Sequence, residues 1–200
     1  KFKKYKQKFA LTGNPRVDFW RKDFKFYYDK KNFIHKDYIL LSLNFTLASK
    51  KELAERFKFL KETDYINRGI TLDSYKKKVK DSSRMYKKFS KLIDFLSKET
   101  NLTIVVRPHP IDKLKNYDFL RKYKKVKVIK KGSISEWIHH AKIVIHSSCT
   151  GGLEASVRGR PTVSYLPFKS THGHPLCDEF SIKTKNIKQC LSVIKKINNN

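Results

Sequence analysis

Short apolar runs alternate along the chain with longer segments in which apolar residues recur at helical spacing. Tyr38–Phe45 and Leu102–Val106 are largely apolar runs of strand length, as expected for strands covered on both faces. After Thr71, apolar residues return every three or four positions as far as Leu96, which predicts one long amphipathic helix. The chain therefore combines buried strands with helices that each have one apolar face.

The same alternation continues to the end of the chain. Further strands are predicted at Val126–Ile129, Lys142–His146 and Thr162–Leu166. Helices are predicted between and around the strands, at Lys50–Thr63, at Lys113–Tyr123, around Trp137, before Arg158 and at Asn186–Ile197. Strands that alternate with such helices imply right-handed crossovers, and hence an α/β fold with a doubly wound, Rossmann-like parallel sheet. Because ligands bind such sheets beyond the carboxyl ends of the strands, we expect the site there.

Two parts of the chain differ in character. The segment Lys1–Asn32 is polar and aromatic around the turn Gly13-Asn14-Pro15, and the regular alternation begins only at Tyr38. We expect residues 1–31 to be the remnant of an interdomain linker and a preceding domain, and residues 32–200 to form one Rossmann-like domain. The chain opens at Lys1 without a methionine, which suggests a fragment. Exposed aromatic side chains should then mark a face toward the preceding domain, the candidates being Phe19, Trp20, Phe24, Phe26 and Tyr27.

The composition adds a strong positive charge. Lys and Arg number 46 against 18 Asp and Glu, which gives a formal net charge of +28. Such a field attracts polyanions, and a non-catalytic nucleic-acid-binding module is therefore one interpretation. The basic residues are mostly lysines spread along the whole chain, however, whereas phosphate readers favour arginine clusters. We expect no specific nucleic-acid partner.

Cysteine usage and hydropathy indicate the cellular setting. The three cysteines, Cys149, Cys177 and Cys190, are odd in number and lack the spacing of a metal site. This indicates a reducing, cytoplasmic compartment rather than a disulfide scaffold. No run in the sequence approaches the roughly 20 apolar residues that a membrane span requires. Neither a bound metal nor another cofactor is expected.

The strongest chemical signal follows the strand Lys142–His146. Ser147-Ser148-Cys149-Thr150-Gly151-Gly152 places three hydroxyls and two glycines where a strand passes into a helix. Glycines let a diphosphate approach the backbone, and the helix N-terminus favours an anion. Glu154, predicted in the first turn, suits the vicinal hydroxyls of a ribose. The simpler alternative is a helix cap made by Ser148 or Thr150, with Glu154 as a favourable first-turn acid.

Two further loops leave the predicted sheet at the same edge. In Arg107-Pro108-His109-Pro110 the prolines stiffen the exit from a strand and present Arg107 and His109, which suit a phosphate group. The alternative is a stiff loop with a surface histidine. Gly132-Ser133 is a weaker signal, because Gly-Ser is a common turn, although a loop at that place suits a nucleobase. Of the other histidines, we expect His172 and His174 at the site opening, and His139 and His140 on the surface or in packing.

Three stretches in series resemble the carboxyl-terminal, nucleotide-sugar-binding half of GT-B glycosyltransferases, and more closely bacterial surface-carbohydrate biosynthesis proteins. Thr12–Asp18 resembles the segment that leaves the amino-terminal domain, Arg107–Pro110 the donor-binding His-Pro loop, and His146–Pro161 the stretch that binds diphosphate and ribose. The wider group includes UDP-N-acetylglucosamine 2-epimerases and CDP-glycerol glycerophosphotransferases. In one departure, Leu153 stands where the family has a first acidic residue before the equivalent of Glu154.

The resemblance implies a glycosyltransferase that moves a sugar from a nucleotide-activated donor to a bacterial surface glycan such as lipopolysaccharide or capsule. Arg107 and His109 would stabilise the departing phosphate. Further donor contacts would come from Gly132, Ser133, Ser147, Ser148, Thr150, Gly151, Gly152 and Glu154. The catalytic base is expected in the missing amino-terminal half, so such a fragment need not be active alone. The positive surface suits lipid-linked acceptors and peripheral contact with the anionic inner face of the cytoplasmic membrane.

A nucleotide-sugar epimerase is the alternative within the same group. It would need acid and base carboxylates near the sugar, and the chain offers few acids at the expected edge of the sheet. If Glu154 holds the ribose, Glu154→Ala should weaken nucleotide binding and leave the fold nearly unchanged.

Overall fold

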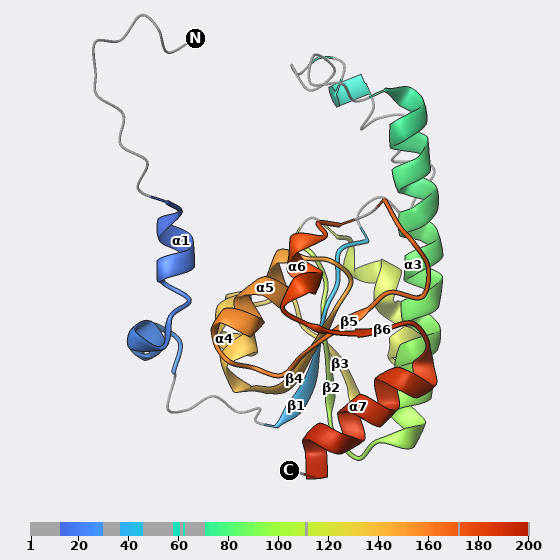
Figure 1. Cartoon of the computed structure of the whole chain (residues 1–200). Helices are drawn as coiled ribbons and strands as arrows, with labels where there is room; N and C mark the ends of the chain where they lie inside the picture. The colour runs from blue at the N-terminus through green and yellow to red at the C-terminus, as the bar shows by residue number, and fades with distance from the viewer. Residues whose placement is uncertain are drawn as a thin grey trace, which may run out of the picture.

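The computed structural model describes residues 13–29, 37–45, 58–60, 62, 71–110, 112–171 and 173–199. Within these residues, a sheet of six strands forms the centre of the molecule (Figure 1). The strands are β1 (Tyr38–Ser42), β2 (Ile104–Arg107), β3 (Val126–Val128), β4 (Ala141–His146), β5 (Thr162–Tyr165) and β6 (Ile182–Thr184). All neighbouring pairs are parallel, so the predicted parallel α/β sheet is confirmed.

The strand order β3-β2-β1-β4-β5-β6 reverses its direction of growth beside β1. The chain first adds β2 and β3 on one side of β1 and then returns to add the other three strands on the opposite side. Leu40 of β1 accordingly pairs with Val105 of β2 on one side and with Val144 of β4 on the other. In sheets of this order, ligands bind in the crevice beyond the carboxyl ends of the strands at the reversal. That crevice lies beyond Ser42 and His146.

Helices cover both faces of the sheet, as Figure 1 shows. One face carries α3 (Leu72–Glu99), the 3-10 helix η4 (Leu114–Leu120) and α7 (Ile187–Asn199), whereas the other carries α4 (Ile134–His140) and α5 (Thr150–Val157). The alternation of side chains along each strand divides the core accordingly. Ile39 of β1 packs with Phe89 of α3 in one cluster, and its neighbour Leu40 packs with Trp137 of α4 in the other.

The long helix α3 follows from the apolar stripe in the sequence. Its N-cap is Thr71, whose side chain accepts a hydrogen bond from the Ser74 amide at 3.1 Å, as helix starts favour. The buried positions return every three or four residues, from Tyr75 to Leu96, and the polar positions between them face solvent. This prediction is confirmed.

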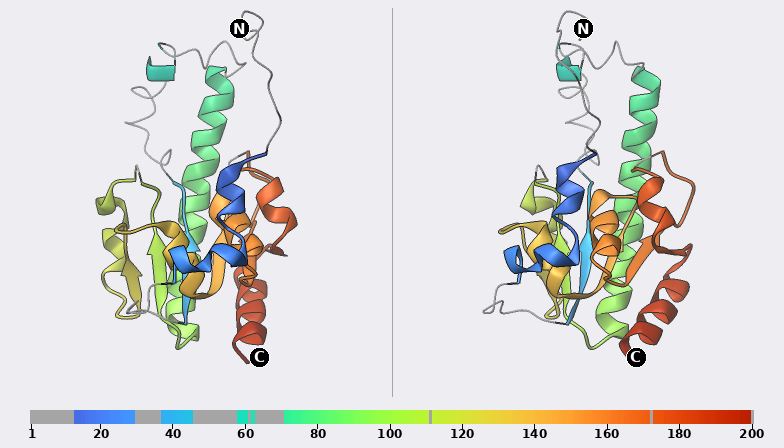
Figure 2. Two further views of the ribbon diagram at one scale, coloured as in Figure 1. Left: turned by 90° about the vertical axis from the view of Figure 1, so that its left-hand side faces the viewer. Right: turned by 60° about the vertical axis from the view of Figure 1, so that its left-hand side comes forward.

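The segment before the sheet contains α1 (Pro15–Asp18) and the 3-10 helix η2 (Lys22–Tyr27), which lies beside α4 and α5 (Figure 2). Phe19, Phe26 and Tyr27 are 49%, 65% and 58% exposed, and the Tyr27 ring contacts the other two. That these side chains mark a face toward a preceding domain stays a prediction. Trp20 is buried, so its predicted place on that face is wrong. The division into residues 1–31 and 32–200 stays a prediction.

Two elements of the carboxyl-terminal region were not predicted, namely the short helix α6 (Leu176–Glu179) and the edge strand β6. The predicted helix Lys50–Thr63 lies mostly outside the described residues. Among the helices that the structure describes, none is both long enough and apolar enough to cross a membrane.

Candidate functional site

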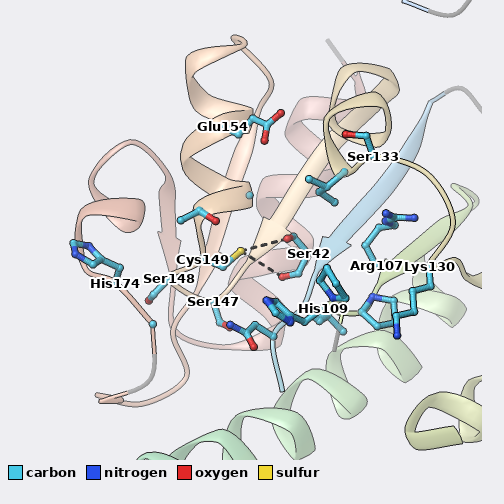
Figure 3. Close-up of a pocket in the computed structure, with 18 of the residues that line it drawn as sticks. Ser42, Arg107, His109, Lys130, Ser133, Ser147, Ser148, Cys149, Glu154 and His174 are labelled. Carbon is cyan, nitrogen blue, oxygen red and sulfur yellow. Dashed lines mark hydrogen bonds between the residues drawn. The ribbon is translucent and has the colours of Figure 1, made fainter. Parts of the chain in front are cut away.

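A cleft of about 740 Å³ opens beyond the carboxyl ends of the strands at the reversal point of the sheet (Figure 3). We call it the switch-point cleft. Its walls are the loops that follow β1 to β4, the start of α5, the loop before α6, and Arg16 of α1. All the donor-binding residues predicted from sequence line it except Gly152, which lies below its floor. Ser42, Asn44, Lys130, Cys149 and Gly173 also line it and were not predicted.

A row of polar residues crosses the sheet at its carboxyl edge. Ser42 of β1 is in register with Arg107 of β2 and with His146 of β4, and His146 is in register with Ser164 of β5. All four side chains are buried. Buried polar groups in such a row need hydrogen-bond partners, and the loops above the sheet supply them. Of these four residues, Ser42 and Arg107 line the cleft, which therefore has fixed polar groups at its floor.

The guanidinium of Arg107 is not free to bind a phosphate group in the way that the sequence suggested, because it is bonded within the protein. Its Nη1 donates to the carbonyl oxygen of Lys131 at 2.6 Å and its Nη2 to that of Gly132 at 2.7 Å. The guanidinium also lies 5.6 Å from the centre of the Trp137 ring, and burial lowers the pKa of Arg107. Arg107 therefore holds the Gly132–Ser133 loop against the end of β2, which brings two predicted parts of the site together.

The His-Pro loop is held by a buried carboxylate. Asp112 Oδ2 accepts hydrogen bonds from the backbone N–H of His109 at 3.2 Å and from the Tyr117 hydroxyl at 2.7 Å. Lys130 Nζ donates to the Asp112 carbonyl oxygen at 2.8 Å, which ties this loop to the loop after β3. His109 is half-buried and lines the cleft beside Lys130 (Figure 3).

The Ser147–Ser148 turn is fixed by contacts behind the cleft. Ser148 has φ +53°, in the left-handed region that few residues other than glycine adopt, and its hydroxyl donates to Asp178 Oδ2 at 2.7 Å. The His174 amide donates to the Ser148 carbonyl oxygen at 2.7 Å. Gly173 lies so close that a Cβ there would meet Ser148 Cβ at 2.4 Å. The turn thus holds the loop that contains His174 in place. His174 lines the cleft, as predicted, whereas His172 lies outside the described residues.

The predicted helix cap is wrong in its residues. The N-cap of α5 is Cys149, and neither Ser148 nor Thr150 caps it, because Ser148 is bound to Asp178 and Thr150 is already helical. Glu154 lies in the second turn, so it is no first-turn acid. Burial raises the pKa of the Cys149 thiol, whose sulfur lies 3.3 Å from Ser42 Oγ. Capping therefore does not explain this stretch of sequence.

The two glycines of α5 are required by packing against the sheet. A Cβ at Gly151 would lie 2.5 Å from Ser42 Oγ, and a Cβ at Gly152 would lie 2.2 Å from His146 Nε2. Both distances are shorter than any real Cβ contact, so only glycine lets α5 start this close to the strands. The glycine pair thus draws the helix onto the floor of the cleft, a role that the sequence did not indicate.

His146 joins β4 to the elements around it. Its Nδ1 accepts from the Cys149 amide at 3.4 Å, so Nε2 carries the proton and donates to Ser181 Oγ at 2.9 Å. The ring is fully buried, and this burial lowers the pKa of His146 to about 4. His146 is therefore neutral at physiological pH and acts as a structural link.

Glu154 lies at the wall of the cleft and is 1% exposed. Its Oε1 is 3.0 Å from Arg158 Nη2, one turn further along α5, and the Arg158 side chain is 4% exposed. No N–H of the guanidinium is directed at this oxygen, so Glu154 Oε1 has a close countercharge but no hydrogen-bond donor among the described residues. This carboxylate oxygen keeps unused capacity to accept a hydrogen bond.

Comparisons with known proteins place the fold. No protein-family profile matches this chain, and no curated protein matches it by sequence. Among solved structures, it is similar to UDP-GlcNAc 2-epimerase of Methanocaldococcus jannaschii in complex with UDP-GlcNAc and UDP, with a TM-score of 0.53 and 19% identity over 96% of this chain. The chain shares its fold with about half of this enzyme. Another structure of the epimerase gives a TM-score of 0.50 and 18% identity over 96% of the chain. The chain spans about half of the epimerase, 48% and 49% of its length.

Proposed function

We propose that the switch-point cleft binds a nucleotide-activated sugar, and that this chain is the donor-binding part of a glycosyltransferase. The observation that carries the proposal is Glu154, a buried carboxylate with a vacant acceptor oxygen, at the wall of a cleft that lies at the reversal point of the sheet. The similarity of the fold to an epimerase whose structure contains UDP-GlcNAc and UDP supports it.

The diphosphate of the donor would lie over the Ser147–Ser148 turn and the start of α5. The positive end of the α5 helix dipole favours an anion there. His109 and Lys130 line the opposite wall and contribute positive charge or hydrogen-bond donors to the departing phosphate. Arg107 would act mainly by holding the Gly132–Ser133 loop in place, and its positive charge would add to the attraction of the cleft for the diphosphate.

The nucleoside would extend from α5 toward the loop after β3. Glu154 would accept the ribose hydroxyls, and Gly132 and Ser133, held by Arg107, would meet the base through backbone groups. Figure 3 shows Glu154 and Ser133 on the same side of the cleft, and the nucleoside would lie on that side. This arrangement needs neither a metal nor another cofactor.

Transfer is preferred over epimerisation because of the acids in the cleft. An epimerase that removes and returns a proton on carbon needs groups that act as base and acid beside the sugar. Among the described residues that line the cleft, Glu154 is the single carboxylate, and it is paired with Arg158. Epimerisation remains the second candidate because the fold is that of an epimerase.

The acceptor we propose is a bacterial surface glycan, or a lipid-linked precursor of one. The net charge of +28 would hold such an enzyme near an anionic membrane surface, where lipid-linked acceptors lie.

Nuclear magnetic resonance in heavy water separates the two candidates. The natural full-length protein is incubated with UDP-, GDP- and CMP-activated sugars, with and without oligosaccharide acceptors. If the enzyme is a transferase, the nucleotide is released at a rate that rises with the concentration of acceptor. The resonances of the carbon-bound sugar protons then keep their intensity. Loss of one sugar proton to deuterium, with the nucleotide still attached, would instead identify an epimerase and overturn the transferase proposal.

A further inference from the structure

A second cleft, of about 470 Å³, lies at the opposite end of α5 from the switch-point cleft. It forms where the segment from Trp20 to Tyr28 passes over the carboxyl ends of α4 and α5 (Figure 2). Trp20 and Tyr28 supply its aromatic walls, and His139, Arg158 and Arg160 line it from the main body of the protein. None of these residues lines the switch-point cleft.

The charges around the second cleft are strongly unbalanced. Five of its nine lining residues are Lys or Arg, and its one acid, Asp23, is exposed and paired with Arg21 at 3.2 Å. Burial lowers the pKa of Arg160, and the neighbouring charge of Arg158 lowers it further. Glu154 pairs with Arg158, and Asp37 and Asp29 act on Arg160 in the opposite sense to Arg158. The lining residues of the cleft are nevertheless mostly cationic, so the cleft attracts an anion.

Two buried polar groups at this cleft lack partners among the described residues. The Tyr28 hydroxyl and Arg158 Nε are both buried without a hydrogen bond. The Arg158 guanidinium lies 3.5 Å above the centre of the Tyr28 ring, and its side chain is 96% buried, being 4% exposed. Unsatisfied buried donors of this kind are uncommon and call for an explanation such as an absent ligand.

We propose that the second cleft binds a phosphate group, either free or at the head of a lipid. Phosphate offers several acceptor oxygens and a negative charge, and guanidinium groups match its geometry with paired N–H donors. Arg160 and the lysines of η2 would make the outer contacts, and Arg158 and Tyr28 would close the inner end.

A metal ion is the less suitable occupant. Asp29, His139 and His140 do offer ligand atoms within 4.8 Å of one another beside this cleft. Their surroundings, however, are cationic: burial lowers the pKa of His139, and the charge of Arg160 is the next largest cause. A divalent cation would add to this repulsion, whereas a phosphate would remove it.

The two tryptophans of the sequence report separately on the two clefts. Trp20 lines the second cleft, and Trp137 donates from Nε1 to the Lys131 carbonyl at 3.3 Å, beside the switch-point cleft. Their two indole N–H signals can be assigned with Trp20→Phe. The chain is titrated with inorganic phosphate and, in a parallel series, with dihexanoyl phosphatidic acid below its micelle concentration, dihexanoyl phosphatidylcholine being the blank.

We expect a saturable shift of the Trp20 signal with at least one of the two phosphates, and Arg160→Gln should weaken it about tenfold. Arg121→Gln, the same substitution at an exposed site of the β3 side, should leave it unchanged. Arg160 is used because removing Arg158 would leave Glu154 without its countercharge. Lys22→Gln combined with Lys25→Gln, both exposed on η2, gives a second test that leaves the core intact and should also weaken the shift.

A Trp20 signal that stays fixed, or that moves equally in the Arg160→Gln and Arg121→Gln variants, would overturn the second site. A shift of Trp137 alone would do so too, since it would place phosphate only in the switch-point cleft. Response to phosphatidic acid but not to inorganic phosphate would assign the lipid source, and equal response to both would assign the free ion. Because each cleft has its own reporter, failure of this site leaves the proposed function untouched.

Discussion

The ion pair between Glu154 and Arg158 determines which substitution can test the proposed contact of Glu154 with the ribose. Both side chains are almost fully buried, so deleting the carboxylate leaves an unpaired guanidinium inside the protein. Breaking a buried pair in this way costs about 3–5 kcal/mol. The expectation from sequence that Glu154→Ala leaves the fold unchanged is therefore corrected. Glu154→Gln also removes the countercharge of Arg158, but it keeps the shape of the side chain and opens no cavity. It is therefore the better variant, with the free energy of unfolding measured beside the affinity.

Glu154→Gln should weaken binding of the preferred nucleoside diphosphate about 10- to 100-fold, because a charge-assisted hydrogen bond is worth about 1.5–3 kcal/mol. Calorimetric titration measures this. The 2′-deoxy nucleotide should bind the natural chain more weakly and lose nothing further in the variant. Glu179→Gln, at an exposed acid paired with Lys183, is the matched control and should not change affinity. Equal affinities in all three proteins would remove the ribose role from Glu154.

At the scale of elements, the contact of α5 with β4 predicts an unusual result for a helix glycine. Alanine is normally about 1 kcal/mol better than glycine inside a helix. Gly152→Ala should nevertheless destabilise the fold by about 1–3 kcal/mol, because the new Cβ would overlap His146 Nε2. Urea unfolding measures the change, with Val157→Ala on the exposed side of the same helix as the control. A Gly152→Ala protein as stable as the natural one would show that α5 does not pack this closely.

The buried histidine that joins β4 to α6 gives the protein an acid sensitivity. Because the pKa of His146 falls to about 4 in the fold from an ordinary value of 6.5, the unfolded chain binds the extra proton first. The stability that neutral His146 contributes is complete above pH 6.5 and is lost as the pH falls toward 4, by about 3 kcal/mol in all. The free energy of unfolding should therefore fall more steeply over this range in the natural chain than in His146→Gln. Parallel curves would contradict the buried, neutral state of His146.

The sequence predicted the elements that carry a strong apolar pattern and missed those that do not. Five strands and the helix α3 follow from continuous or periodic apolar residues. The strand β6 has three residues, of which Ile182 and Lys183 are exposed, so it forms by pairing with β5 rather than by burying its own side chains. The pattern of apolar and polar residues in the sequence does not indicate such a strand.

The candidate site likewise has features that could be predicted from the sequence and features that could not. The loops at the carboxyl edge could be predicted, since the alternation of strands and helices determines which loops meet there. The bond from Arg107 to the loop after β3 and the bond from Ser148 to Asp178 could not, because they join residues about 25 to 30 positions apart. Ser42 was within reach of sequence reasoning, as it ends a strand in the same row as Arg107 and His146.

At the scale of the whole molecule, binding by the net charge of +28 and binding in the cleft should depend on salt to different degrees. Diffuse attraction of a lysine-rich surface to DNA or anionic vesicles is screened and releases counterions, so it should fall steeply between about 0.05 and 0.5 M salt. Nucleotide-sugar binding in an enclosed cleft, with hydrogen bonds from fixed loops, should fall much less. Titrations of both ligands over this range test the difference. Equal salt slopes would favour a general polyanion-binding module.

The switch-point cleft is proposed to bind the nucleotide part of an activated sugar. The most direct test is a thermal-unfolding series of the natural chain with UDP, GDP, CDP, CMP and their sugars, each at millimolar concentration. A ligand at about 100 times its dissociation constant should stabilise the fold by about 2.7 kcal/mol, which appears as a shift of several degrees in Tm. We predict such a shift for at least one base, larger for its sugar conjugate than for inorganic phosphate. No shift with any nucleotide, or the same shift with inorganic phosphate as with all of them, would contradict the account.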